Sequence, residues 1–308
     1  MLARASAAGV GTGALYALLH NRPVRRATAG LELPDYRAGL EATAPVLAVA
    51  DAADPNAAVR RAIDALGGIA RFVRPGERVL LKPNVGFDRP PSFGATTSPT
   101  AVAAVVRLCR EAGASRVWVT DNPINNPLRC FAVSQVGAAV EEAGGTVKLP
   151  QSSDMGPIAV SGDAIQTWVG LAGLLQHADR LIGIPTVKDH NLAGISVTMK
   201  NWYGFLGGGR NTFHQKLDLV IADLADAFIP TLVVVDATRV LVRNGPTGGR
   251  SSDVMATEQI AAGTDQVALD AWAAELMGRR ASDIPSIMEA ERRGIGTSLW
   301  RTLNPVMA

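Results

Sequence analysis

Short apolar runs alternate with helix-like segments along most of this chain of 308 residues. The runs are rich in Val, Ile and Leu and have the length of buried strands, whereas the segments between them repeat apolar residues every three or four positions. Because neighbouring parallel strands are joined by helical crossovers, this order predicts an α/β fold with a mainly parallel open sheet and helices on both faces. The expected strands are residues 46–49, 78–82, 116–120, 146–149, 180–184 and 231–236, with a weak one at 158–160.

The helix-like segments place the crossovers and leave one long stretch without a regular pattern. Residues 185–215 are predicted to form a loop-rich insertion over the carboxyl edge of the sheet. We expect a single α/β domain over residues 45–296, followed by a loose tail at 297–308. The expected helices are residues 56–72, 98–113, 128–143, 165–177, 215–228, 266–277 and 283–293.

Charge and composition argue against some classes of function. The chain has 30 basic and 28 acidic residues, a net charge of +2, and 5% aromatic residues. A nearly neutral chain with no basic cluster and few stacking side chains is not expected to bind nucleic acid. The two cysteines, Cys109 and Cys130, form no CxxC motif, so no iron–sulfur cluster is expected. They are predicted to be buried free thiols, with a disulfide as the alternative in an exported protein.

An uncharged run near the N-terminus bears on the location of the protein. Residues 5–19 follow Arg4 and are too few for a comfortable transmembrane helix. They fit the apolar core of a signal peptide or an N-terminal anchor. We therefore predict that residues 1–44 form a signal- or anchor-like segment with a linker, and that the protein is periplasmic or membrane-tethered on the extracytoplasmic side. A cytoplasmic protein with a frayed N-terminal helix is the alternative.

Polar residues follow four of the expected strands near the point where each strand ends. Because the carboxyl ends of parallel strands meet at the same edge of a sheet, these polar groups are predicted to share one ligand crevice. They are Lys82 with Asn84, Asp121, Lys188 with His190, and Asp236.

Lys200, His214 and His190 are the candidates for catalysis. Imidazole titrates near neutrality, and the two histidines flank a glycine triplet at 207–209. Lys200 precedes an aromatic segment, and a lysine in apolar surroundings is either functional or held in an ion pair. Metal binding by both histidines with Asp121 is an alternative, but the histidine spacing matches no HExxH-like motif, so neither a metal nor a cofactor is assigned. A structural role is the alternative for each histidine.

Seven further residues are candidates for binding a ligand. Six of them carry basic, amide or hydroxyl groups that suit anionic oxygens, and the seventh, Asp121, could bind a ribose, a metal or a lysine. A lysine at a strand end also fits a snorkelling role, and a threonine near a helix start fits loop or cap hydrogen bonding. Together with Lys200 they bring excess positive charge to one edge, offset in part by acidic residues, and this predicts affinity for a small anionic molecule. The seven are Lys82, Asn84, Thr97, Asp121, Lys188, Asn201 and Arg210, and the offsetting acids are Asp121, Asp189 and Asp236. Ser98 is the expected N-cap of the helix that follows it.

A set of short motifs is specific when taken together. The motifs are VLLKPN at 79–84, TTSP at 96–99, VTD at 119–121, KDH at 188–190, TMKNWYGFL at 198–206, His214, VALDAWAAELMG at 267–278 and GIG at 294–296. They resemble the domain-of-unknown-function 362 (DUF362) family over about residues 45–296. The resemblance implies that the candidate lysines, histidines and asparagines belong to the family pattern, and it implies no reaction. Members are often exported, and several carry a ferredoxin-like module whose CxxCxxC clusters are not found in this sequence, so no iron–sulfur role is expected.

Two classes of function stay open at the level of sequence. The first is a protein that binds a small anionic ligand or cofactor in a crevice of Lys, His and Asn side chains, with catalysis left open. The second is a non-catalytic accessory or assembly subunit with a protein partner in a membrane-associated or extracytoplasmic redox complex. Dependence of any activity on Lys200 and His214 distinguishes the two classes.

Overall fold

The computed structural model describes residues 30–39 and 46–308, and the signal-like run at 5–19 lies outside them. Within the described residues, ten strands form a main sheet and three form a small separate sheet. The strands of the main sheet are β2 (Leu47–Asp51), β3 (Arg78–Pro83), β4 (Arg116–Val119), β5 (Thr146–Val147), β8 (Arg180–Ile184), β9 (Thr186–His190), β10 (Gly194–Ser196), β11 (Leu232–Leu241), β12 (Val254–Gly263) and β13 (Val306–Met307). The small sheet consists of β1 (Leu31–Glu32), β6 (Gly156–Ala159) and β7 (Thr167–Gly170).

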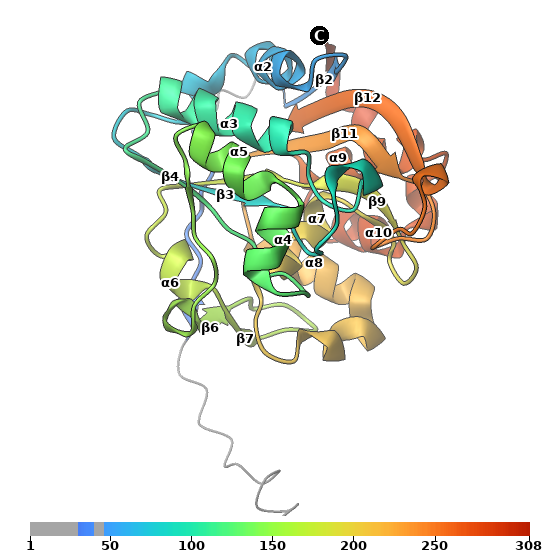
Figure 1. Ribbon diagram of the computed structural model, residues 1–308. Coiled ribbons are helices and arrows are strands. Elements are labelled where there is room, and N and C mark those ends of the chain that lie inside the picture. The colour runs from blue at the N-terminus through green and yellow to red at the C-terminus, as the bar shows by residue number, and fades with distance from the viewer. Residues whose placement is uncertain (1–29, 40–45) are drawn as a thin grey trace, which may run out of the picture.

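The main sheet is mostly parallel, which confirms the predicted α/β fold class (Figure 1). Its order is β13-β2-β12-β11-β8-β3-β4-β5, and off this path β9 pairs with β11 and β10 pairs with β9. Neighbours from β11 to β5 are parallel, whereas β12 is antiparallel to both β2 and β11. Strand β12 was not predicted because its first half mixes apolar and polar residues that are exposed or half-buried, and only its last four residues are buried.

Helices cover both faces of the sheet (Figure 1). One face packs against α2 to α5 and the other against α7 to α10, with α6 beside the small sheet. The alternation within β3 shows why two cores form: Val79 and Leu81 belong to the first, and Leu80 to the second. The helices are α2 (Pro55–Ala65), α3 (Pro99–Glu111), α4 (Pro127–Val133), α5 (Val136–Glu142), α6 (Ala172–Leu175), α7 (Thr198–Asn201), α8 (Leu217–Ala227), α9 (Gln266–Leu276) and α10 (Pro285–Arg292).

The helix predicted at 165–177 is wrong. This segment forms strand β7 and then the four-residue helix α6. Trp168 and its neighbours favour a strand, and β7 pairs with β6 in an antiparallel ladder. Gly170 also approaches the backbone of Phe205 so closely that a Cβ would lie 2.7 Å from its carbonyl oxygen. Tertiary pairing therefore overrides the helical spacing of the apolar residues.

The segment at residues 128–143 and the tail after residue 296 also differ from the predicted secondary structure. The single helix predicted at 128–143 is two helices, α4 and α5, because Gln135 between them adopts a φ of 62°, which a right-handed helix does not allow. The tail expected after residue 296 ends in β13, which pairs with β2 in parallel.

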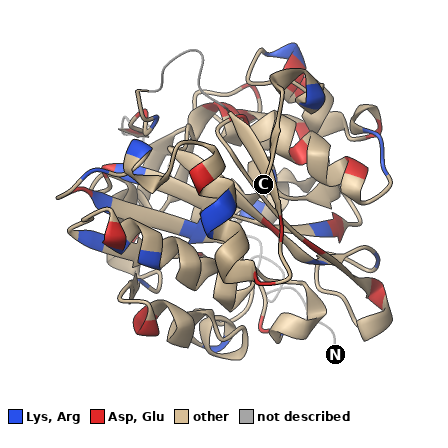
Figure 2. Ribbon diagram, turned by 90° about the horizontal axis from the view of Figure 1, so that it is seen from above, with Lys and Arg blue, Asp and Glu red and all other residues tan. Residues whose placement is uncertain are grey.

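The predicted insertion at 185–215 is more regular than a loop. After Pro185 the chain continues as β9, which forms a hairpin with β10 and also pairs with β11. Helix α7 follows, and then come 3₁₀ turns at Trp202–Phe205 and Arg210–Lys216. This folded insertion brings its polar side chains to the carboxyl ends of β3 and β4. Basic and acidic residues are interspersed over the molecule (Figure 2), in keeping with its near-neutral composition.

Candidate functional site

A cavity of about 390 Å³ lies at the carboxyl edge of the sheet, between the ends of β3 and β4 and the insertion. It brings together nine of the ten predicted site residues, and Thr97 is the exception. Polar residues at the carboxyl ends of parallel strands are expected to lie together at one edge of the sheet, as these residues do. The roles assigned to them stay predictions. The nine are Lys82, Asn84, Asp121, Lys188, His190, Lys200, Asn201, Arg210 and His214.

Lys82 and Asp121 form a buried ion pair in the cavity wall. Lys82 Nζ lies 2.8 Å from Asp121 Oδ1, and the two side chains are only 1% and 4% exposed. The parallel register of β3 and β4 explains the meeting, because Lys82 lies near the carboxyl end of β3 and Asp121 follows the carboxyl end of β4. Burial lowers the pKa of Lys82, and the charge of Asp121 opposes this shift. The other oxygen, Oδ2, accepts a hydrogen bond from the Val85 N–H at 2.7 Å.

The backbone at Gly204 packs against this ion pair. A Cβ at this position would lie 1.9 Å from Asp121 Oδ1 and 2.5 Å from Lys82 Nζ, so only glycine fits. The Gly204 carbonyl accepts a hydrogen bond from the Asn122 N–H at 2.8 Å, which ties the insertion to the loop after β4. Sequence reasoning missed Gly204, because a glycine among aromatic residues does not reveal what its backbone approaches.

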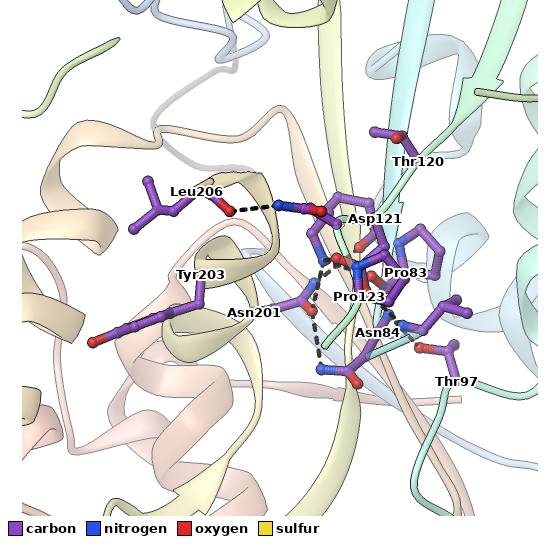
Figure 3. A network of polar contacts seen from close by, with 12 residues as sticks. Pro83, Asn84, Thr97, Thr120, Asp121, Pro123, Asn201, Tyr203 and Leu206 are labelled. Carbon is purple, nitrogen blue, oxygen red and sulfur yellow. Dashed lines mark hydrogen bonds and ion pairs between the residues drawn. The ribbon is translucent and has the colours of Figure 1, made fainter. Parts of the chain in front are cut away.

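Two asparagines connect the Lys82 ammonium to that of Lys188. Figure 3 shows these two residues, Asn84 and Asn201, joined by a hydrogen bond. Asn201 Oδ1 accepts from Lys82 Nζ at 3.2 Å and from Asn84 Nδ2 at 3.3 Å, while Asn201 Nδ2 donates to the Lys82 carbonyl at 2.9 Å. Asn84 Oδ1 in turn accepts from Lys188 Nζ at 2.9 Å. Lys188 also donates to the Ala95 carbonyl at 2.7 Å. Protein groups therefore hold both lysine ammonium groups in fixed positions.

The alternation of β9 decides which residues of the KDH motif face the cavity. Lys188 and His190 are two positions apart and share one face of the strand, whereas Asp189 lies on the other. There Asp189 accepts from Arg279 Nη2 at 2.6 Å and from the Gly245 N–H at 2.9 Å. Asp189 therefore does not line the cavity, and the expectation that it offsets the lysine charges there is wrong.

The two imidazoles of the cavity are held in opposite tautomers. His190 Nδ1 accepts from the backbone N–H groups of Leu192 and Ala193, each at 3.2 Å, so its proton is on Nε2. His214 Nδ1 lies 2.8 Å from the Asn211 carbonyl, which only accepts, so Nδ1 carries a proton and Nε2 is the nitrogen that presents a lone pair in the neutral ring. Burial, helped by nearby positive charges, lowers the pKa of His190 to about 3. His190 is therefore a neutral donor and exposed His214 an acceptor.

Lysine is rare in this chain and concentrated at the cavity. Only five of the 30 basic residues are lysines, and three of the five line the cavity. Arginine keeps its charge in proteins, whereas a buried lysine readily loses its proton. Burial lowers the pKa of Lys188 to about 7, with repulsion from Lys200 as the next cause. Burial and then Arg210 lower the pKa of Lys200 to about 8. The scarcity of lysine is therefore a compositional signal, visible in the sequence, that these three positions have a special role.

Arg210 braces the insertion against the loop after β4. Its Nη1 donates to the carbonyls of Tyr203 and Leu206, each at 2.9 Å. Its Nη2 donates to the carbonyls of Asn122 and Pro123 at 2.7 and 3.2 Å. Backbone carbonyls thus occupy both terminal nitrogens of the guanidinium. The geometry gives Arg210 a structural part in the wall, and its ligand-binding role stays a prediction.

Thr97 and Asp236 stand behind the cavity wall and not in it. Thr97 Oγ1 accepts from the Asn84 N–H at 2.8 Å and donates to the Ile184 carbonyl at 2.6 Å, so it positions Asn84. Asp236 Oδ2 accepts from the Ser98 N–H at 2.6 Å at the start of α3. The Ser98 side chain makes no cap hydrogen bond, contrary to expectation. Of the three carboxylates expected to offset the lysines, only Asp121 lines the cavity.

The sequence model of one protein family matches residues 79–275, which is more than half of the chain. The family is described as "Domain of unknown function (DUF362)". The chain belongs to the DUF362 family. The resemblance predicted from the motifs is thereby confirmed, and the matched range contains every described residue that lines the cavity.

Two known proteins are similar to this DUF362 chain. "Thylakoid-associated protein sll1697" of Synechocystis sp. is 28% identical over 253 residues, covering 78% of this chain and 75% of the relative. Among solved structures, the lactate racemase apoprotein from Thermoanaerobacterium thermosaccharolyticum has 14% sequence identity and a TM-score of 0.42. The similarity covers 79% of this chain, which spans 58% of the length of that structure.

Cysteine chemistry and metal ligation add little to this site. In residues 30–39 and 46–308 there is no group of three or more His, Cys, Asp or Glu placed to hold a metal ion. Cys109 and Cys130 are free and buried, as predicted. Burial raises the pKa of Cys109 to about 12 and that of Cys130 to about 11, so both are unreactive hydrophobic side chains.

The described helices include none that is long and apolar enough to cross a membrane.

Several cavity residues were not among the predicted ones. Ser196 pairs with Lys188 across the hairpin and so shares its face, but the short β10 gave no strand signal. The Phe87 ring centroid lies 5.1 Å from Lys188 Nζ, in a loop whose path the sequence does not define. The lining residues outside the ten candidates are Gly86, Phe87, Asn122, Ile124, Asn191, Leu192, Ser196, Tyr203, Gly204, Asn211 and Pro246, of which Asn122 and Asn191 belong to polar clusters expected at this edge.

Proposed function

We propose that the DUF362 cavity binds a small anionic organic molecule or cofactor. One observation carries the proposal: three lysines and Arg210 line the cavity, and Asp121 is the only carboxylate among its described lining residues. Asp121 is already paired with Lys82. The lowered pKa values of Lys188 and Lys200 express the cost of charging them in this place. A bound anion offsets that cost and brings these two lysines back to their charged form.

The two imidazoles of the cavity supply directed hydrogen bonds to the same ligand. His190 offers a donor at Nε2, and His214 offers an acceptor at Nε2. A donor and an acceptor of this kind suit a ligand that carries a carbonyl or hydroxyl group next to its anionic group. The same pair supports proton transfer, so Lys200, His214 and His190 remain the proposed catalytic residues.

The test is thermal unfolding with added anions at fixed ionic strength. We expect phosphate, sulfate or a dicarboxylate to raise the melting temperature of the wild type, because a ligand at 100 times its Kd adds about 2.7 kcal/mol to the free energy of unfolding. Lys200→Ala should lose this increment. Lys148→Ala, which removes an exposed lysine that does not line the cavity, should keep it. Equal increments in the wild type and Lys200→Ala would refute anion binding at this cavity.

An accessory role at a membrane is the second candidate function. It is supported by the name of the Synechocystis relative, which is thylakoid-associated, and by the uncharged run at residues 5–19. In this proposal the protein is exported or tethered and contacts a partner of a redox complex. A fusion of residues 1–44 to a reporter that is active only in the periplasm should be active, and a cytoplasmic reporter signal argues against export. Capture of a partner that survives Lys200→Ala favours this role over ligand chemistry.

A further inference from the structure

Lys200 differs from the other two cavity lysines in that a ligand can reach it. Lys82 and Lys188 are 0% and 2% exposed, and each donates hydrogen bonds to protein oxygens. Lys200 is only partly buried, and among the described residues its ammonium has no hydrogen-bond or ion-pair partner. Its neighbour is the Tyr203 ring, whose centroid lies 4.8 Å from Nζ. The cavity therefore contains two lysines fixed by the protein and one with its nitrogen free.

We propose that Lys200 is a nucleophile that forms a Schiff base with the carbonyl group of a 2-oxo acid bound in this cavity. The inference rests on the proposed function, because it names the class of anion that the cavity takes. An amine forms a reversible covalent bond with a carbonyl group without any cofactor. The positive charge of the cavity selects a carboxylate, and a 2-oxo acid places its carbonyl directly beside one.

The other cavity groups match the needs of this reaction. A nucleophilic lysine must be neutral, so the reaction uses the uncharged fraction of Lys200 while Lys188 and Arg210 hold the carboxylate. Burial next to the Arg210 charge lowers the pKa of Lys200 to about 8, so near neutrality this fraction is larger than for an ordinary lysine. His190 and Lys200 line the same cavity. The Nε2–H of His190 is a donor for the carbonyl oxygen, and His214 Nε2 is an acceptor for a proton.

The step is balanced with the groups present. The lone pair of Lys200 Nζ attacks the carbonyl carbon, the C–N bond forms, and the C=O π pair moves to oxygen, where the His190 N–H stabilises it. Proton transfer from nitrogen to oxygen, through His214, gives the neutral carbinolamine. The nitrogen lone pair then forms the C=N bond as the hydroxyl leaves, and the remaining proton of the nitrogen, relayed by His214, goes to that hydroxyl to make water. One amine and one carbonyl give one imine and one water, and no oxidant or reductant is consumed.

Borohydride trapping tests the inference on the full chain. The protein is incubated near neutral pH with pyruvate, or with 2-oxoglutarate, and then with sodium borohydride, which reduces an imine to a stable secondary amine. Peptide mass mapping should find the adduct at Lys200, more than about tenfold above the exposed Lys148 and Lys216, because an ordinary lysine with a pKa near 10.4 is neutral far less often. Lys200→Arg keeps the charge and should lose the adduct, whereas Lys148→Arg should behave as the wild type.

A matched ligand separates failure of this inference from failure of the proposed function. Lactate carries the same carboxylate as pyruvate but no carbonyl, so it reports anion binding alone through thermal stabilisation. If lactate stabilises the protein and neither oxo acid is trapped at Lys200, the Schiff base is wrong and the anion site stands. If lactate and the oxo acids all fail to stabilise and no adduct forms, both proposals fail. Equal labelling of Lys148, Lys200 and Lys216 also overturns the Schiff base.

Discussion

Asp121 Oδ1 lies 2.8 Å from Lys82 Nζ, and this ion pair is almost completely enclosed by protein. It joins the end of β3 to the first turn after β4, and the insertion then packs over it at Gly204. From Lys82 a chain of hydrogen bonds runs through Asn201 to Asn84. A change at this pair is therefore expected to alter both the stability of the fold and the shape of the cavity.

Removing the charge of Asp121 should strongly destabilise the protein. In Asp121→Asn the Lys82 ammonium keeps its burial and loses its counter-ion, and breaking a buried pair in this way costs about 3–5 kcal/mol. The double variant with Lys82→Met should recover part of that loss, because no uncompensated charge remains. Denaturant unfolding of the two single variants and the double variant measures the coupling. Additive losses would show that the pair contributes no interaction of its own.

Gly204→Ala should disturb the same pair from the other side. The new Cβ would fall 1.9 Å from Asp121 Oδ1, so either the insertion or the ion pair must move, with an overpacking cost of about 1–3 kcal/mol. Gly209→Ala is the matched control, because a Cβ there meets nothing within 4 Å and the φ is −79°. Its stability should change by less than about 0.5 kcal/mol. Comparable losses in the two variants would contradict the close approach at Gly204.

The place of the cavity could be predicted from the sequence, whereas the hydrogen bonds that join its residues could not. Parallel strands put Lys82 and Asp121 at one edge because both follow apolar runs of buried-strand type. The contact between Asn84 and Asn201 joins residues 117 positions apart, and no local pattern predicts such a contact. The face of Asp189 was also hidden, because residues 186–190 were expected to be loop, and without a strand there is no alternation to apply.

Because neighbouring side chains of β9 lie on opposite faces, substitutions at residues 188 and 189 should have different effects. Lys188→Met should abolish the stabilisation by anions, because it removes a cavity ammonium held by Asn84. Asp189→Asn should leave that stabilisation intact and lower stability by about 1 kcal/mol, because it weakens a partly exposed pair with Arg279 on the far face. Anion titrations followed by melting temperature compare the two variants. Loss of the anion effect in Asp189→Asn would contradict the assigned faces.

Anion binding should weaken as the pH rises through about 7 and then about 8. These are the lowered pKa values of Lys188 and Lys200, and an anion binds their protonated forms. Without anion the slope has the opposite sign: above these values the folded lysines lose protons that the unfolded chain still holds, so the two lysines make stability rise with pH until their ordinary pKa near 10.4.

The measurement is the melting temperature from about pH 6 to pH 9, with and without sulfate at constant ionic strength. Asp270, whose pKa is raised to about 7, also titrates in this range, so the comparison must be with a variant. The contribution of Asp270 to stability falls as the pH rises to about 7, which opposes the trend of the lysines. This contribution is the same in the wild type and in the lysine variant. Subtracting the curve of the variant with Lys188→Met and Lys200→Ala isolates the two lysines. An anion increment that stays constant across this range would mean that neither lysine binds the anion.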